Sequence, residues 1–321
     1  MKPHTLLAIL FVFSLSPAAH AKTTSTKISK KNPIRKLAAK PIIGEYLEQQ
    51  DEIPQNVCML RNVTVEENKI STSYCSGTLI SPGRVLTAEH CRHIAIGGKV
   101  HCGYQGLDSY DSPKFSEALA INGEPLQISS AHPEHASNGA DFMIVDLKTE
   151  SKITPMAYAD DYKKTLESIF SEDLETGIFY LKDDIECRMA GVGTDNEGKM
   201  SHMHIAKLQI GEQYRLRYSR GWEKYGMGYV ALSNRADFPT MKDVNKAAGI
   251  LNTNHTGKGD SGGPLYCKID GTWTVIGTLH GGDDTIDLWS MLGTEAFLLL
   301  DKISKIPIPD RTAAIKTLGE K

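Results

Sequence analysis

The chain has 321 residues, of which 40% are hydrophobic and 23% charged, the composition of a globular protein with two ordinary domains or one large all-β unit. A mean hydropathy of -0.29 and a single long apolar run, at the N-terminus, exclude a polytopic membrane protein. Beyond residue 41 the chain carries 28 basic against 39 acidic side chains, so we expect no nucleic-acid partner.

The N-terminus is typical of an export signal. Residues 1–21 place a basic residue ahead of a short apolar stretch and end in the small-residue pattern Ala19-His20-Ala21, which predicts a signal peptide. The stretch is too short to span a membrane, which needs about 20 apolar residues. We therefore expect a secreted protein, extracellular or periplasmic, without a membrane anchor in its mature form. Residues 22–41 hold seven Lys/Arg and no acid and predict a flexible pro-segment.

From residue 55 onward, short apolar segments alternate with turn residues, which predicts an all-β protein. The expected strands are Val57–Leu60, Gly77–Ile80, Arg84–Thr87, Phe142–Leu147 and Ile178–Leu181, with a hairpin of Leu265–Ile269 and Thr272–Leu279 turning at Asp270-Gly271. Two helices are expected. One contains Tyr158, Tyr162, Leu166 and Phe170 at every fourth position, and the other begins after Thr294 as its cap and ends before Pro307.

The six cysteines of an exported protein favour disulfides, although their spacing alone leaves the pairing open. A zinc site is the alternative reading of these cysteines, because Cys91 lies two residues before His93 and Cys102 follows His101. Neither pair has the spacing of a C-x-x-C ligand pair, so we expect no metal and no organic cofactor.

Three motifs carry chemistry: LTAEHC at 86–91, ADFMIVDL at 140–147 and GDSGGPL at 259–265. Together they resemble the chymotrypsin/trypsin-like family of secreted serine endopeptidases, from about residue 42 to the C-terminal helix. The resemblance implies an all-β fold of two six-stranded antiparallel β-barrels with a C-terminal helix. The implied division is a signal peptide (1–21), a pro-segment (22–41), a peptidase domain (42–306) and a tail (307–321), with the first barrel over about 42–155, a connection over 156–176, the second barrel over about 177–292 and the helix over about 294–306.

The motifs also imply a catalytic triad. His90 takes the place of the general base, Asp141 that of the orienting carboxylate and Ser261 that of the nucleophile, in the chain order of the family. A serine hydroxyl needs such a base, and a buried carboxylate fixes the tautomer of the histidine. The N–H groups of Gly259 and Ser261 are expected to bind the oxyanion of the tetrahedral intermediate.

The motif GDSGG also fits the G-x-S-x-G nucleophile elbow of α/β-hydrolases. That fold places the acid and then the histidine after the serine. Here only His280 follows Ser261, and Asp270, the only acid between them, lies in a hairpin turn. The motif therefore favours a peptidase, and the remaining alternative is a secreted binding protein that has kept the protease fold without turnover. We expect protein or peptide substrates, possible protein inhibitors and a monomer.

The resemblance also implies the disulfides and the activation step. It pairs Cys75 with Cys91 and Cys187 with Cys267, which leaves Cys58 with Cys102 on neighbouring strands of the first barrel. The segment Ile42-Ile43-Gly44-Glu45 resembles the new N-terminus that cleavage of the pro-segment exposes. Its α-amino group is expected to pair with Asp260, the acid before the nucleophile.

Several residues near the expected substrate cleft depart from the family. His255, Lys258 and His280 predict a pocket for an acidic side chain, whereas Asp287 could line the same pocket and attract a basic one. Alternatively, the histidines pack as neutral residues without a role in selection. Gly281 and Gly282 are expected to bind the peptide backbone. Glu89, where the family usually has alanine, is expected to raise the pKa of His90 if it does not turn to solvent.

Overall fold

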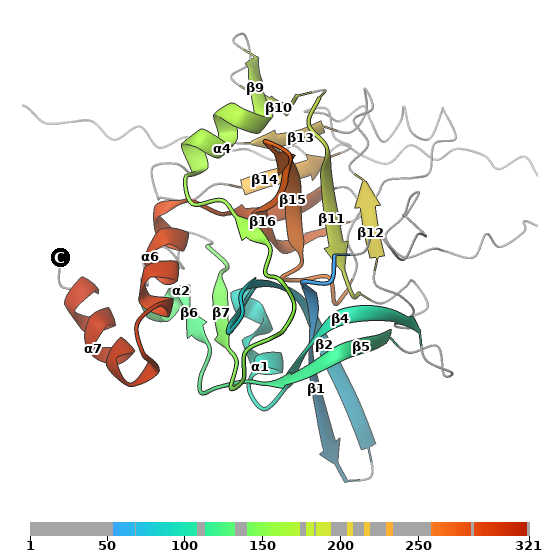
Figure 1. Cartoon of the computed structure of the whole chain (residues 1–321), viewed down its shortest axis with the longest axis vertical. Helices are drawn as coiled ribbons and strands as arrows, with labels where there is room; N and C mark the ends of the chain where they lie inside the picture. Colours follow the sequence, from blue (N-terminus) through green and yellow to red (C-terminus); the bar gives the residue numbers. More distant parts are fainter. Residues whose placement is uncertain are drawn as a thin grey trace, which may run out of the picture. The chain divides into compact units, whose positions relative to one another are not determined.

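The structure is a computed structural model (Figure 1). It describes residues 54–67, 69–107, 113–131, 140–173, 178–182, 184–193, 204–207, 215–218, 229–233, 258–283 and 286–319. All of them belong to one compact unit, Ala39–Lys321. None of the helices in these ranges is long and apolar enough to cross a membrane.

The N-terminal half forms an antiparallel sheet with the strand order β5-β4-β1-β2-β3-β7-β6. Its strands are β1 (Val57–Glu66), β2 (Lys69–Ser81), β3 (Arg84–Thr87), β4 (Lys99–Leu107), β5 (Pro113–Ala120), β6 (Leu126–Gln127) and β7 (Met143–Asp146). β5 and β6 stand at opposite ends of this order but follow each other in the chain, and an isolated bridge pairs Ile121, directly after β5, with Leu147, directly after β7. The segment from β5 to β6 therefore pairs with β4 on one side and β7 on the other, which closes the sheet into a barrel of six strands.

The second sheet has the order β12-β11-β15-β16-β17-β14-β13-β10-β9, with β8 pairing parallel to β16. Its strands are β8 (Ala157–Tyr158), β9 (Phe170–Asp173), β10 (Ile178–Leu181), β11 (Cys187–Gly191), β12 (His204–Lys207), β13 (Arg215–Tyr218), β14 (Tyr229–Ser233), β15 (Pro264–Ile269), β16 (Thr272–Asp283) and β17 (Ile286–Met291). The predicted hairpin is β15–β16. Its turn has positive φ at both Asp270 (49°) and Gly271 (80°), which is the conformation expected of an Asp-Gly turn.

Alternate side chains of β1 belong to two different hydrophobic clusters. Cys58 and Leu60 point into the cluster inside the first barrel, whereas Val57 and Met59 belong to the larger cluster that also contains side chains of the second sheet, such as Trp289. All four strand residues are buried. Because successive side chains of a strand alternate between its faces, β1 joins the barrel interior to the core shared with the second sheet.

The helices are η2 (Glu89–Cys91), α1 (Arg92–Ala95), α2 (Ile128–Ala131), α4 (Tyr162–Ile169), α6 (Glu295–Ser304) and α7 (Ile308–Gly319). α4 is shorter than the periodicity predicted, because Tyr158 lies in β8 and Phe170 begins β9. Asp161 begins it, accepting from the N–H groups of Lys163 and Lys164. α6 lies where a C-terminal helix was expected, but the Thr294 hydroxyl donates back to Met291 O and does not cap the helix.

Three disulfides cross-link the described residues: Cys58–Cys102, Cys75–Cys91 and Cys187–Cys267. They are the three pairs implied by the resemblance. The first links β1 to β4, the second links β2 to the end of η2, and the third links paired residues of β11 and β15. These cross-links limit the freedom of the unfolded chain and so stabilise both sheets.

Within the predicted tail (307–321), the residues Ile308–Gly319 form the helix α7. Its Arg311 is buried and binds Asp146 of β7 with both terminal guanidinium nitrogens, while it also donates to the carbonyl oxygens of Ser304 and Ile306. Pro309 is compatible with the first turn of this helix, where its missing N–H costs nothing. This anchor could not be predicted from local sequence patterns, because it joins residues 165 positions apart.

We expect Arg311→Met to lower the free energy of unfolding by about 3–5 kcal/mol, because Asp146 is left as a buried charge without its main partner. Urea unfolding followed by circular dichroism measures the change. Lys316→Met, at an exposed position of the same helix, is the matched control and should change stability by less than about 0.5 kcal/mol. Equal unfolding midpoints for the two variants would show that α7 is not held by this ion pair.

Candidate active site

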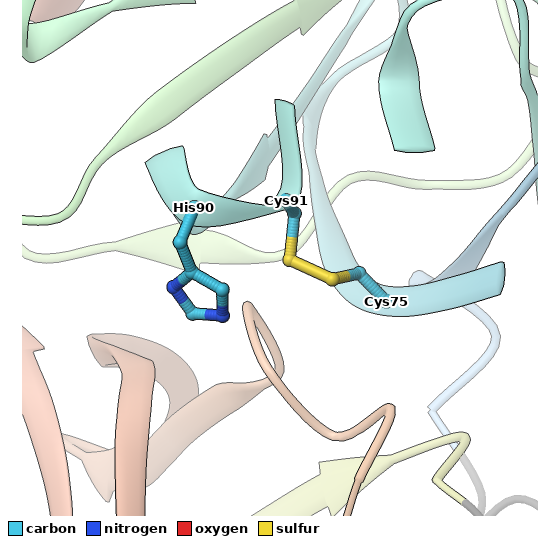
Figure 2. A group of neighbouring side chains, drawn as sticks. All are labelled: Cys75, His90 and Cys91. Carbon is cyan, nitrogen blue, oxygen red and sulfur yellow. A yellow bond between two sulfur atoms is a disulfide. The ribbon is translucent and has the colours of Figure 1, made fainter. Parts of the chain in front are cut away.

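His90 is positioned by a short helix and a disulfide. β3 ends at Thr87, and the 3-10 helix η2 places His90 directly before Cys91, whose sulfur is bonded to Cys75 of β2. Figure 2 shows the imidazole beside the disulfide, and a ring nitrogen of His90 lies within 4.8 Å of both sulfurs. The disulfide therefore anchors the backbone that carries the imidazole to the barrel.

Asp141 holds His90 at two points. One carboxylate oxygen accepts from the main-chain N–H of His90 at 3.0 Å, and the other lies 2.7 Å from His90 Nδ1. The hydrogen bond to Asp141 raises the pKa of His90, against the opposing effect of burial. Burial acts to raise the pKa of Asp141, but hydrogen bonds from His280 and His90 outweigh it and keep that pKa well below its usual range. The carboxylate is therefore an anion that orients the imidazole.

The loop that carries Ser261 is bonded to the first barrel beside His90. The carbonyl oxygen of Ser261 accepts from Ser76 N at 2.8 Å. Gly262 has a φ of 80°, and a Cβ there would lie 2.1 Å from Thr87 Oγ1, so only glycine allows this close approach. Ser261 thus lies next to the end of β3, from which His90 follows. No hydrogen bond joins the hydroxyl of Ser261 to His90, an arrangement common in sites without substrate.

Ser76 connects the loop that carries Ser261 to both sheets, a role that the sequence did not predict. It is fully buried; its hydroxyl donates to Gly259 O and accepts from Val192 N, both at 2.9 Å. Thr87 Oγ1 in turn donates to Ser76 O at 2.7 Å. Its position directly after Cys75 carries no sequence signal of this role. The N–H groups of Gly259 and Ser261 donate to no acceptor within the described ranges.

Asp260 is buried, with 3% of its surface exposed. Its Oδ1 accepts from Gly193 N at 2.7 Å. A Cβ at Gly191 or Gly193 would lie within 2.6 Å of that oxygen, so the carboxylate needs glycine at both positions. Ile42, its expected partner, lies outside the described residues.

The structure brings together only part of the expected substrate pocket. His255 and the side chain of Asp287 lie outside the described residues, and Lys258 is exposed at the start of the loop that carries Ser261. Gly281 and Gly282 lie on β16 and pair with Leu288 and Asp287 of β17. The pocket for an acidic or a basic side chain therefore stays a prediction.

His280 has a contact that the sequence analysis did not anticipate. Its Nδ1 lies 2.8 Å from Asp141 Oδ2, the same oxygen that binds His90 Nδ1. The two imidazoles meet edge to face, with 6.3 Å between their ring centroids. Two histidines thus share one buried carboxylate. The alignment of motifs placed His280 at a position where the family often has serine, but it gave no information on where the ring points.

Glu89 binds Ser129, whereas the sequence predicted an effect of Glu89 on His90. Its carboxylate accepts from both the main-chain N–H and the hydroxyl of Ser129. Burial raises the pKa of Glu89, and the hydrogen bonds from Ser129 oppose this effect. The raised pKa of His90 has its origin in Asp141 and not in Glu89. The expectation that Glu89 would act on His90 is therefore not supported, because Ser129 binds it.

Comparison with known proteins agrees with this geometry. The family model described as Trypsin matches residues 59–287, well over half of the chain. A curated protein named Ovochymase, from Halocynthia roretzi, is 26% identical over 199 residues, an alignment that covers 61% of this chain but only 11% of that protein. The chain thus corresponds to a small part of this relative's length. The match over most of the chain, on a fold of two antiparallel β-sheets of the double-barrel type, shows that the chain belongs to the trypsin family of serine proteases.

Proposed function

We propose that the protein is a secreted serine endopeptidase that cleaves peptide bonds through His90, Asp141 and Ser261. The observation that carries the proposal is the double contact of Asp141 with His90, made beside a loop whose Ser261 carbonyl is bonded to β2. Asp141 fixes the tautomer in which Nδ1 carries the proton, which leaves Nε2 free to act as a base.

In the reaction, the hydroxyl oxygen of Ser261 attacks the carbonyl carbon of the substrate while His90 Nε2 takes the hydroxyl proton. The same nitrogen then gives that proton to the leaving amine, and an acyl-enzyme remains. Water then attacks the ester carbonyl carbon while His90 Nε2 takes a proton from the water. The same nitrogen returns this proton to the oxygen of Ser261 as the ester bond breaks. Asp141 stays ionised throughout and stabilises the imidazolium that forms twice in each cycle.

The N–H groups of Gly259 and Ser261 are the proposed oxyanion hole. Neither has an acceptor within the described ranges, so both remain available to a developing negative charge. A donor of this kind contributes roughly 3–4 kcal/mol to transition-state stabilisation. The turn that presents them is held by the bonds of Ser76 to Gly259 O and Ser261 O.

We expect Ser76→Ala to lower kcat by about 10-fold with little change in KM. The substitution leaves Gly259 O and Val192 N without their buried partner, which costs about 1–3 kcal/mol and loosens the turn on which the oxyanion donors lie. Steady-state kinetics on a peptide substrate measures the effect. Ser73→Ala, at an exposed position of the same strand, is the control. Equal kcat values for the two variants would show that Ser76 does not support the oxyanion site.

A peptide substrate can bind as an added strand along β16 at Gly281 and Gly282. Two preferences for the side chain that precedes the cleaved bond are compatible with the residues near the cleft. An acidic preference would point to His255, Lys258 and the second nitrogen of His280, and a Lys/Arg preference would point to Asp287. A cleavage profile of the processed protein on a peptide library decides between them and tests the function itself. No cleavage of any peptide would favour a non-catalytic binding protein.

The proposal includes export and activation. Residues 1–21 would direct the chain out of the cytoplasm, where the three disulfides can form, and residues 22–41 would be removed before the enzyme acts. The partners would be protein or peptide substrates and protein inhibitors of a monomeric enzyme.

A further inference from the structure

Three side chains of the types that bind transition metals meet at the proposed triad. His90, Asp141 and His280 each offer one ligand atom, and these atoms lie within 4.8 Å of one another. Both imidazoles approach through Nδ1, at 2.7 and 2.8 Å from the same oxygen of Asp141. Two histidines and one carboxylate form the ligand set of several zinc enzymes.

The site is open to an ion from solvent on one side. The side chains of His90 and His280 are 44% and 42% exposed, whereas that of Asp141 is 7% exposed and forms the floor. The ion pairs of Asp141 within the described ranges are those with the two histidines, so no lysine or arginine among these residues occupies the place of a cation. The nearby carboxylate of Glu89 adds negative charge.

A second cluster at the same histidine can be set aside. Cys75 and Cys91 also lie near His90, but their sulfurs are joined to each other and offer no thiolate (Figure 2). A metal at His90 therefore depends on Asp141 and His280.

We propose that His90 Nδ1, Asp141 Oδ2 and His280 Nδ1 form an inhibitory site for Zn²⁺, with water as the fourth ligand. Zinc binds imidazole nitrogen and carboxylate oxygen at about 2.0–2.2 Å, which the three atoms can reach by small movements of the two exposed rings. This inference rests on the proposed function, since it makes the triad itself the regulated element.

The chemical consequence follows from the proton on the imidazole. A neutral His90 has one N–H, and an ion on Nδ1 forces that proton onto Nε2. Nε2 then has no lone pair to accept the proton of Ser261, so the base is lost while the metal is bound. The Nδ1–H bond is lost and an Nε2–H bond forms by proton exchange with solvent, no other covalent bond of the protein changes, and removal of the metal restores the original tautomer. Inhibition is therefore reversible.

Binding is tested first without any need for activity. Isothermal titration of Zn²⁺ into processed protein carrying Ser261→Ala should give one bound ion. Adding His280→Ser, which keeps a small hydrogen-bond donor beside Asp141, should weaken binding by at least about 10-fold. His93→Ser, on the neighbouring helix α1 but outside the cluster, is the matched control and should leave binding unchanged. If His280→Ser fails to fold, His280→Asn takes its place.

Peptide hydrolysis by the otherwise unmodified processed enzyme should then fall on addition of Zn²⁺ and recover with a chelator. Mg²⁺, which prefers oxygen ligands, should have no effect. His280→Ser should need at least about 10-fold more Zn²⁺ for the same fractional inhibition. Zinc binding or inhibition that is equal in the His280 variant and the parent protein would overturn the proposal. A protein that binds zinc through His280 but hydrolyses nothing would instead refute the proposed function and leave the metal site standing.

Discussion

Processed protein carrying Ser261→Ala should hydrolyse peptides on the order of 10⁶-fold more slowly than the parent enzyme, because it lacks the proposed nucleophile. Asp141→Asn should lower kcat about 10⁴-fold, since an amide favours the wrong tautomer of His90. Steady-state kinetics with active-site titration measures both effects.

A double variant of Ser261 and His90 tests whether the two residues act in one mechanism, which neither single variant does. Residues that act as one unit are not additive, so Ser261→Ala with His90→Ala should be no slower than Ser261→Ala by itself. The Ser261 and His90 variants should melt at the temperature of the parent or close to it, because neither Ser261 nor the exposed ring of His90 belongs to the core. A further large loss in the double variant would mean that the two residues do not act in one mechanism.

Removal of residues 22–41 is also expected to have a large effect on activity. A chain that still carries residues 22–41 should be about 10²–10³-fold less active than one that begins at Ile42, the loss that follows when an oxyanion donor is misplaced. The proposed reason is that the freed α-amino group of Ile42 pairs with Asp260, directly before Ser261. Asp260 is buried and already bonded to Gly193 N, so its position also fixes the turn that carries Gly259.

Edman sequencing of active material should read Ile-Ile-Gly-Glu. The bond before Ile42 follows Pro41, so a protease that tolerates proline, or trimming after a first cut, has to produce this terminus. Asp260→Asn should lose most of the activity with the fold intact, whereas Asp184→Asn, at an exposed position, should lose none. Full activity of a chain that keeps residues 22–41 would show that the device is absent here.

The sequence predicted the parts of the site that depend on local motifs. The segment at 86–91 specifies a strand end, a histidine and a cysteine, and the structure places them as a short helix bonded to β2. The turn at Asp270-Gly271 was predictable because the required positive φ values belong to two adjacent residues that tolerate them. Such features are encoded within a few residues, so they can be predicted without knowledge of the fold.

Contacts between distant segments could not be predicted in the same way. His280 was placed near the cleft, but whether its ring would face a substrate or Asp141 depends on how β16 lies against β7, 139 residues away in sequence. The partner of Glu89 on α2 and the anchor of Arg311 in the first barrel have the same origin. A charged or polar side chain can bind any of several nearby partners, and a single sequence does not show which of these partners it binds.

The central claim is that Ser261 is a nucleophile activated by His90 and Asp141. Its most direct test is to treat the processed protein with a serine-directed fluorophosphonate and to locate the adduct by mass spectrometry. We expect one adduct, on Ser261, formed at a rate that falls steeply in Asp141→Asn and absent from Ser261→Ala. An unlabelled Ser261 in folded, correctly processed protein, or an adduct on another residue that persists in Ser261→Ala, would contradict the account.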